Sequence, residues 1–390
     1  MNLQLSTRVQ SIKPSPTLAV TNRAAELRAA GQDIIGLGAG EPDFDTPQHI
    51  KDAATDAIKN GFTKYTAVDG TPALKNAIIK KFKNDNNLDY QANQVLVSCG
   101  GKQSFFNLSL ALLNPGDEVV IPAPYWVSYP DMVKIAEGVP VVIETNAQAR
   151  FKITPEQLDN AITNKTKLVV LNSPSNPSGM AYSKAEFIAL GDVLRKYPDV
   201  LIATDDMYEH ILWTEESFNN ILTANPDLYD RTIVLNGVSK AYSMTGWRIG
   251  YAAGPQALIG AMKKIQSQST SNPTSIAQVA AQAALEGDQG CVKDMVKVFK
   301  QRHDYMVKAL NEIDGIDCLA GDGTFYVFPD FSGMQKKLGC ETDTDLAEKL
   351  LEAGVALVPG SAFGTSGHMR ISFATSDDNL QKAVERLKTA

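Results

Sequence analysis

The chain has 390 residues, of which 44% are hydrophobic and 21% charged, and its formal net charge is −7. This length and composition are typical of a globular protein with two domains and argue against a disordered chain. The acidic balance, without a long run of like charges, argues against nucleic-acid binding, and no apolar stretch is long enough to span a membrane.

We expect no targeting signal, because the N-terminal segment at 1–16 lacks the apolar core of a signal peptide and soon reaches prolines. We therefore expect a cytoplasmic protein. A helix is predicted at 18–30, where Gly31 follows as a helix terminator, and the apolar run at 34–37 is a candidate strand. The four cysteines stand far apart without metal-binding spacing, so we expect free buried thiols and no metal site.

Residues 46–290 alternate between short apolar runs and helical segments. The predicted strands, rich in Val, Ile and Leu, lie at 94–98, 118–121, 168–171, 200–204, 232–235 and 249–253. Predicted helices between them include 102–113, 155–163 and 184–196. Strands of nearly continuous apolarity are usually covered on both faces. The pattern therefore predicts a large α/β domain with a mostly parallel sheet flanked by helices.

Residues 291–390 follow a different pattern, with a long predicted helix at 292–313 and another at 345–353. Strand-like runs lie at 324–328, 355–358 and 369–373, and a helix ends the chain. We expect these residues to form a smaller α+β domain together with residues 1–45, so that this domain contains both ends of the chain.

Unusual residues follow the ends of the predicted strands, where open α/β sheets place their ligand crevices. These segments are GGKQ at 100–103, PYWVSY at 124–129, NSPSNPSG at 172–179, TDDMYEH at 204–210 and SKAYSMTGWR at 239–248. A glycine turn before a helix exposes backbone N–H groups that can bind phosphate. A lysine in an apolar strand-end pocket can have a lowered pKa and act as a nucleophile and base. Singly, each segment also fits an ordinary turn, cap or surface charge, but together they indicate one site.

Taken together, these segments resemble the class I, fold-type I aminotransferases that depend on pyridoxal phosphate (PLP), and are closest to the bacterial aspartate/aromatic subgroup. The resemblance extends from Pro14 to the C-terminal helix and implies the fold-type I PLP transferase fold. It implies that Lys240 carries the cofactor as a Schiff base and later moves the proton. Arg248 would bind the cofactor phosphate, and Asp205 would pair with the pyridine nitrogen.

The same resemblance assigns the other cofactor contacts. Tyr208 and Asn176 would meet the ring 3′-oxygen, and Trp126 would stack on the ring. The phosphate would also be bound by Ser239 and by the turn formed by Gly101, Lys102 and Gln103. Tyr65 would reach the cofactor phosphate of a neighbouring subunit, which implies a homodimer.

Substrate contacts are expected on both sides of the cofactor. The segment GLGAGEPDF at 36–44 is followed too soon by proline for a dinucleotide fingerprint. It resembles the family segment in which Gly40 lets substrate approach the backbone. Arg370, inside an apolar strand, needs a buried anion, and with Asn176 it would bind the substrate α-carboxylate. Lys102 is the candidate cation for the distal carboxylate of an acidic substrate, and residues 269–271 of the partner could add polar contacts.

Flat apolar walls for an aromatic side chain would come from Trp126, Tyr125 and Phe325. The segment GDGTFY at 321–326 departs from the usual family pattern beside Phe325. Gly237 also stands where some relatives have a phosphate-binding serine.

The resulting functional hypothesis is a two-stage (ping-pong) transfer of the amino group from aspartate, phenylalanine, tyrosine or tryptophan to 2-oxoglutarate. Three alternatives stay open from the sequence. A PLP-dependent β-lyase would share the cofactor residues, and an aminotransferase for alanine or another donor would share the whole site. A regulator with an aminotransferase-like domain would need a DNA-binding domain, for which this chain has no room.

Overall fold

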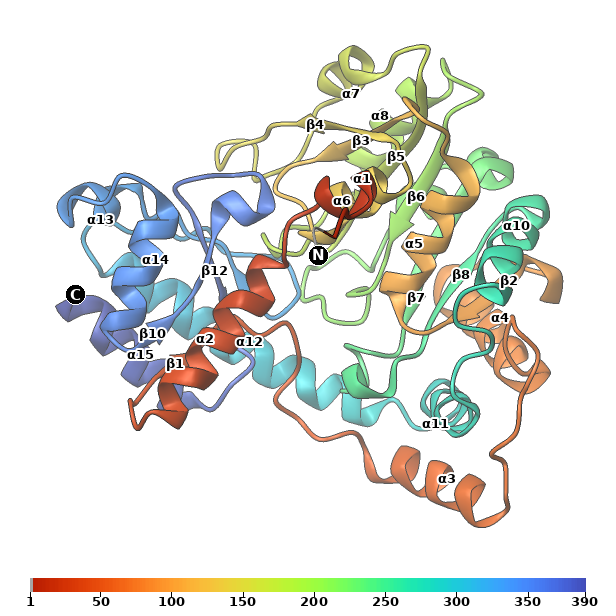
Figure 1. Ribbon diagram of the computed structural model, residues 1–390, viewed down its shortest axis with the longest axis horizontal. Helices are drawn as coiled ribbons and strands as arrows, with labels where there is room; N and C mark the ends of the chain where they lie inside the picture. Colours follow the sequence, from red (N-terminus) through yellow and green to blue (C-terminus); the bar gives the residue numbers. More distant parts are fainter. Residues whose placement is uncertain (1–2) are drawn as a thin grey trace.

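The computed structural model describes residues 3–390. A seven-stranded sheet with flanking helices forms the larger part of the molecule, and a smaller part lies beside it (Figure 1). The strand order is β2-β8-β7-β6-β5-β3-β4, in which β8 runs antiparallel to both of its neighbours, β2 and β7, and the other neighbouring strands are parallel. The strands are β2 (Val95–Ser98), β3 (Glu118–Pro122), β4 (Val139–Ile143), β5 (Thr166–Asn172), β6 (Leu201–Asp205), β7 (Thr232–Gly237) and β8 (Gly250–Ala253). The predicted α/β class with a mostly parallel sheet is confirmed.

Apolar helices cover both faces of this sheet, which explains the apolar strands. Successive residues of a strand point to opposite faces. Val95 and Val97 of β2 pack in one core with Leu74 of α4, while Leu96 packs in another with Phe105 of α5. The helices of this part are α3 (Gln48–Lys59), α4 (Pro72–Asn86), α5 (Gly101–Leu112), α6 (Ser128–Ile135), α7 (Pro155–Ala161), α8 (Lys184–Leu194), α9 (Ile221–Ala224), α10 (Gln256–Ser267) and α11 (Ser275–Glu286).

Strand β4 is absent from the sequence-based prediction. It contains Pro140, and proline within a strand is confined to edges because it cannot donate a ladder hydrogen bond. The structure places β4 at the edge of the sheet, where β3 is its one partner among the described residues, and Val139 and Val142 are exposed. Because some of its residues are exposed, the sequence of β4 resembles that of a surface segment.

The smaller part contains residues from both ends of the chain. Strand β1 (Ile35–Gly36) pairs in parallel with β10 (Val355–Ala356), and β12 (Met369–Ser372) lies between β11 (Val358–Pro359) and β9 (Tyr326–Val327). The helices of the smaller part are α2 (Pro16–Ala29), α12 (Gly290–Asn311), α13 (Ser332–Lys337), α14 (Asp343–Glu352) and α15 (Asp377–Thr389), whereas α1 (Thr7–Gln10) lies near α6 of the larger part. The predicted domain boundaries, between residues 45 and 46 and between residues 290 and 291, agree with the pairing of β1 with β10 and stay predictions.

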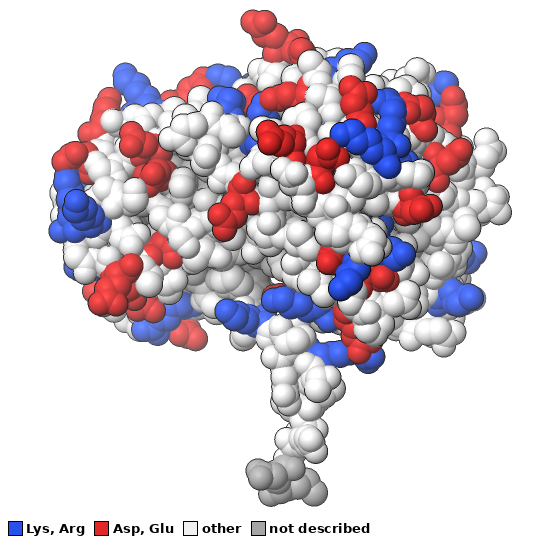
Figure 2. All heavy atoms as spheres, turned by 90° about the horizontal axis from the view of Figure 1, so that it is seen from above, with Lys and Arg blue, Asp and Glu red and all other residues white. Residues whose placement is uncertain are grey.

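Acidic and basic side chains are interspersed over the face shown in Figure 2, without a broad region of one sign. Within residues 3–390, no helix combines the length and the apolarity needed to cross a membrane. The cysteines are free, but only Cys318 is buried, so the expectation of four buried thiols was wrong for the other three, which are partly exposed. They lie near segment ends, where packing is less complete.

Candidate active site

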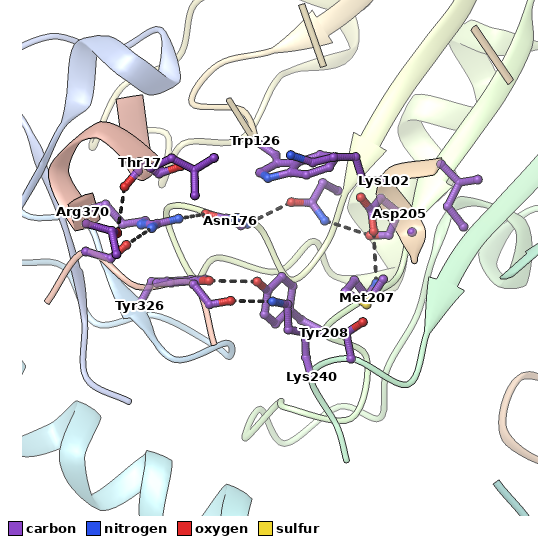
Figure 3. Close-up of a pocket in the computed structure, with 18 of the residues that line it drawn as sticks. Thr17, Lys102, Trp126, Asn176, Asp205, Met207, Tyr208, Lys240, Tyr326 and Arg370 are labelled. Atoms are coloured by element: carbon purple, nitrogen blue, oxygen red, sulfur yellow. Dashed lines mark hydrogen bonds between the residues drawn. The ribbon is translucent and has the colours of Figure 1, made fainter. Parts of the chain in front are cut away.

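A cavity of about 380 Å³ lies where the two parts of the molecule meet, beyond the carboxyl ends of β5 and β6. This is the usual position of ligand sites in open α/β sheets. Most of the predicted site residues line it: Gly40, Gly101, Lys102, Trp126, Asn176, Asp205, Tyr208, Ser239, Lys240, Arg248 and Arg370. Figure 3 shows Arg370 and Asp205 toward opposite ends of this cavity, with Asn176 and Lys240 between them.

Lys240 follows β7 after a short turn and reaches across to the smaller part. Its Nζ donates a hydrogen bond to the carbonyl oxygen of Gly40 at 2.5 Å. Removal from water, with a smaller contribution from the charge of Arg370, lowers the pKa of Lys240 to about 8. A substantial fraction of this amine is therefore neutral near physiological pH, which a nucleophile or general base requires.

Asp205 is the last residue of β6, and its carboxylate accepts two hydrogen bonds. The Tyr129 hydroxyl donates to Oδ2 at 2.5 Å, and the backbone N–H of Met207 donates to Oδ1 at 3.2 Å. Burial raises the pKa of Asp205, whereas these donors and the nearby Lys240 oppose the rise. The Asn172 amide donates to the Asp205 carbonyl at 2.9 Å and so holds the backbone at this strand end.

Asp206, the next residue, points away from the cavity because side chains alternate along an extended segment. It accepts hydrogen bonds from Thr204 and Asn220 in the protein interior. Burial and the charge of Glu209 raise its pKa to about 8. The structure thus brings Asp205, rather than Asp206, to the cavity.

At the other end of the cavity, Arg370 of β12 is buried with incomplete hydrogen bonding. It donates to Asn176 Oδ1 at 3.0 Å and to the Gly38 carbonyl at 2.7 Å, but its Nε has no partner among the described residues. The guanidinium lies 4.4 Å from the ring centroid of Tyr326, whose hydroxyl is 3.0 Å from that of Tyr208. Within residues 3–390 no carboxylate pairs with this cation, so it is suited to an anionic ligand.

The third region of the cavity contains a glycine turn at the start of α5. Gly100 has φ 88°, and a Cβ there would lie 2.3 Å from Arg248 Nη2, so glycine allows the guanidinium to approach the turn. Gly250 of β8 has a similar role, since a Cβ there would lie 2.2 Å from the Gly101 nitrogen. The guanidinium, the helix N-terminus and the nearby hydroxyl of Ser239 form a phosphate-binding environment.

These groups fit the PLP that the sequence resemblance implies. Arg248, Ser239, Lys102 and the Gly101 amide are donors suited to its phosphate, and Asp205 is an acid suited to its ring nitrogen. Trp126 offers a flat apolar surface between these two ends, and its ring lies edge-on to Tyr129 at 5.2 Å. The unpartnered Nε of Arg370 leaves a separate anion site for a substrate carboxylate.

The structure does not bring every predicted residue to the cavity. The N–H of Gln103 donates to Gly100 within the helical turn, and its side chain bonds to Cys99 and Thr270 outside the cavity. Phe325 is fully buried behind Tyr208, with the ring centroids 5.6 Å apart, so the expected cavity wall at Phe325 was wrong. Its neighbour Tyr326 lines the cavity instead, because adjacent side chains of this extended segment point in opposite directions.

Two other predicted residues lie outside this cavity. Tyr125 packs against Gly364, where a Cβ would meet its ring at 2.5 Å. Tyr65 is 91% exposed in the single chain and lines no part of the cavity. Its expected role concerns a second subunit and stays a prediction.

Several residues at the site were not predicted from the sequence. Tyr326, Asn172, Met207, Thr17, Leu18 and Thr21 also line the cavity. Asn172 could have been found, since it directly follows the predicted strand at 168–171, and in the structure it lies opposite Asp205 in the sheet. The residues of α2 carried no local signal, because only the packing of the two parts places this helix over the cavity.

Comparison with known proteins gives the family. The model of the family "Aminotransferase class I and II" matches residues 32–387. The chain is 63% identical to the aspartate/prephenate aminotransferase of Nitrosomonas europaea, with 99% of each chain covered. It is 55% identical to that of Cereibacter sphaeroides, with 98% of each covered.

Solved structures show the same relationship. The aspartate aminotransferase of Rhizobium meliloti matches with a TM-score of 0.96 and 50% identity, covering 100% of this chain and 99% of that one. The Thermus thermophilus aspartate aminotransferase with maleate matches with a TM-score of 0.93 and 43% identity, covering 99% of each. The chain therefore belongs to the class I and II aminotransferases, enzymes that transfer amino groups with pyridoxal 5′-phosphate as cofactor.

Proposed function

We propose that the protein transfers the amino group of aspartate and of aromatic amino acids to 2-oxoglutarate, with Lys240 as the catalytic residue. The observation that carries the proposal is the single cavity in which the Lys240 amine, with its lowered pKa, is placed with Asp205 and the incompletely bonded Arg370. The names of the relatives from Nitrosomonas and Cereibacter support aspartate as a substrate and add prephenate as a candidate amino acceptor.

Bound PLP supplies a carbon that bonds covalently to amines and a ring that accepts electrons. In this proposal Arg248, Ser239, Lys102 and the Gly101 amide would hold the phosphate. Asp205 would keep a proton on the ring nitrogen. Tyr208 and Asn176 would hold the ring oxygen.

The remaining residues act on the substrate. Arg370 and Asn176 bind the α-carboxylate and so fix the α-carbon, while Trp126 and Tyr326 limit access of water. Gly40 allows the substrate to lie close to the backbone. With PLP in place, the Lys240 amine would move the proton from the substrate α-carbon to the cofactor carbon. The amino group would remain with the cofactor, water would release the donor as its 2-oxo acid, and 2-oxoglutarate would then receive the amino group by the reverse steps.

Lys102 supports the proposed dual specificity. Its Nζ lies 5.2 Å from the ring centroid of Trp126, so that a cation and an aromatic surface adjoin. The cation suits the distal carboxylate of aspartate or 2-oxoglutarate, and the aromatic surface suits a phenyl, phenol or indole ring. Burial lowers the pKa of Lys102, with a further contribution from Arg248. Partial desolvation of this kind strengthens the attraction of a cation for an anionic ligand.

The proposal includes a cytoplasmic homodimer with two domains per chain, residues 46–290 and residues 1–45 with 291–390. The large exposed ring of Tyr65 supports a contact with a second subunit. In the dimer we expect Tyr65 to reach the partner's phosphate site.

A panel of amino donors tests the proposal. The holoenzyme is assayed with aspartate, phenylalanine, tyrosine, tryptophan, alanine and leucine, each with 2-oxoglutarate, and with prephenate as a second acceptor. We expect turnover with aspartate and the aromatic donors, glutamate as the product, and no release of ammonia. Release of ammonia when no 2-oxo acid acceptor is added would indicate a β-lyase. Turnover with alanine or leucine alone would contradict the substrate class.

A further inference from the structure

Tyr129 lies outside the cavity lining but contacts two residues of the proposed cofactor site. It is in the first turn of α6, and its side chain is 1% exposed. Its hydroxyl donates to Asp205 Oδ2 at 2.5 Å, although the two residues are 76 positions apart in the chain. Its ring meets Trp126 edge-on at 5.2 Å and packs on Phe105 at 4.8 Å. One buried side chain therefore supports both the acid and the flat apolar surface.

We propose that Tyr129 is a positioning residue, which holds the Asp205 carboxylate in its orientation and in its charged form and fixes the ring of Trp126. This inference rests on the proposed function, because it assigns Tyr129 a role only if Asp205 acts on the cofactor ring. Tyr129 itself touches neither cofactor nor substrate in this account.

The hydrogen bonds of Asp205 explain the effect. A buried carboxylate without donors becomes protonated, since burial penalises its charged form. The carboxylate of Asp205 has only two donors among the described residues, the Tyr129 hydroxyl and the Met207 amide at 3.2 Å. Loss of the hydroxyl would leave a single backbone donor. Asp205 would then become more basic and retain the proton that the ring nitrogen is meant to carry.

Tyr129 is suited to this task because it remains a donor. Burial and the neighbouring Asp205 raise the pKa of Tyr129 well above its usual value. The phenol therefore keeps its proton throughout the working pH range and does not add a second negative charge beside Asp205. Phe105 and Trp126 restrict its ring from two directions, so the hydroxyl has little freedom to turn away.

The test compares two substitutions that each remove one buried hydroxyl. Tyr129→Phe keeps the ring that packs on Trp126. Tyr90→Phe is the matched control, because the Tyr90 hydroxyl is buried in the core without a hydrogen-bond partner in the described chain. For both holoenzymes we would record the visible absorbance of bound PLP between pH 5 and 10, and kcat and KM for aspartate with 2-oxoglutarate.

For Tyr129→Phe we expect kcat to fall about ten-fold or more, the typical effect of losing a hydrogen bond to a charged group. KM should change less than about three-fold, since the Arg370 carboxylate site is intact. The midpoint of the absorbance titration should move upward, because a less positive ring nitrogen repels the proton on Lys240 Nζ less. Tyr90→Phe should match the wild-type protein in all three measurements.

A second comparison separates this inference from the proposed function. In an Asp205→Asn background, adding Tyr129→Phe should change kcat and the titration less than about two-fold, because the carboxylate through which it acts is gone. Wild-type behaviour of Tyr129→Phe, or a full additional loss in the double variant, would overturn the inference while leaving the proposed function standing. If Asp205→Asn alone behaved as wild type, the proposed role of Asp205 would fail, and the inference with it.

Discussion

The Lys240 amine donates a hydrogen bond to the carbonyl oxygen of Gly40, a residue 200 positions earlier in the chain. Lys240 follows a strand of the large sheet, whereas Gly40 follows β1 of the smaller part. The contact therefore joins the two parts of the molecule at the proposed reacting group.

The pKa of Lys240 predicts how PLP capture depends on pH. Below pH 8 the amine is largely protonated and cannot attack a carbonyl, and above it the amine is neutral. The rate at which apoprotein combines with PLP should rise with pH and level off above about 8. Stopped-flow absorbance measures this rate. A rate that keeps rising to pH 10.5, the ordinary lysine pKa, would contradict the lowered value.

Arg370→Ala should raise KM for every amino donor by about a hundred-fold, because a charge-assisted pair with a carboxylate is lost in a buried site. Arg370→Lys should recover part of this loss, since it keeps the charge but not the paired donors. Steady-state kinetics with aspartate and phenylalanine give both values. Arg195→Lys, at a surface ion pair, is the control. A loss confined to aspartate would mean that Arg370 binds the distal carboxylate.

Lys102→Met should separate the two proposed substrate classes. Aspartate loses the cation for its distal carboxylate, so its kcat/KM should fall about ten-fold or more relative to that of phenylalanine. The measurement is the ratio of the two kcat/KM values, which cancels any common loss from weaker phosphate binding. An unchanged ratio would show that another cation recognises aspartate.

Gly250→Ala should disturb the phosphate turn, because the added Cβ would lie 2.2 Å from the Gly101 nitrogen. We expect weaker PLP binding and a loss of about 1–3 kcal/mol in the free energy of unfolding, as overpacking usually costs. Gly260→Ala in α10 is the control, since a Cβ there meets no atom within 4 Å. It should stabilise the protein by about 0.5–1 kcal/mol. Equal behaviour of the two variants would refute the close approach.

The sequence predicted the sheet well where burial is uniform. Strands β5, β6 and β7 are nearly continuous apolar runs, and the polar residues at their ends stood out against them. Edge strand β4 was not recognised in the sequence, because partial exposure and Pro140 make it resemble a loop. Local composition thus identifies central strands better than edges.

Site residues that directly follow a strand could be predicted from the sequence. Residues whose role depends on the direction of the side chain, or on a contact with a distant part of the chain, could not. Phe325 and Tyr326 are adjacent and both aromatic, and their residue types do not indicate that Tyr326 faces the cavity while Phe325 is buried. Tyr129 gave no sign of its bond to Asp205, because it comes from a helix far away in the sequence. Contacts of this kind depend on the packing of the whole chain.

The central claim is that Lys240 carries PLP. Reduction of the holoenzyme with borohydride, followed by proteolysis and mass spectrometry, measures it directly. We predict the added cofactor mass on the peptide that contains Lys240. In Lys240→Ala this mass, the visible absorbance and the turnover should all be lost, while Lys297→Ala, at an exposed surface position, keeps all three. Cofactor mass on another lysine of the wild-type protein, or turnover by Lys240→Ala, would contradict the account.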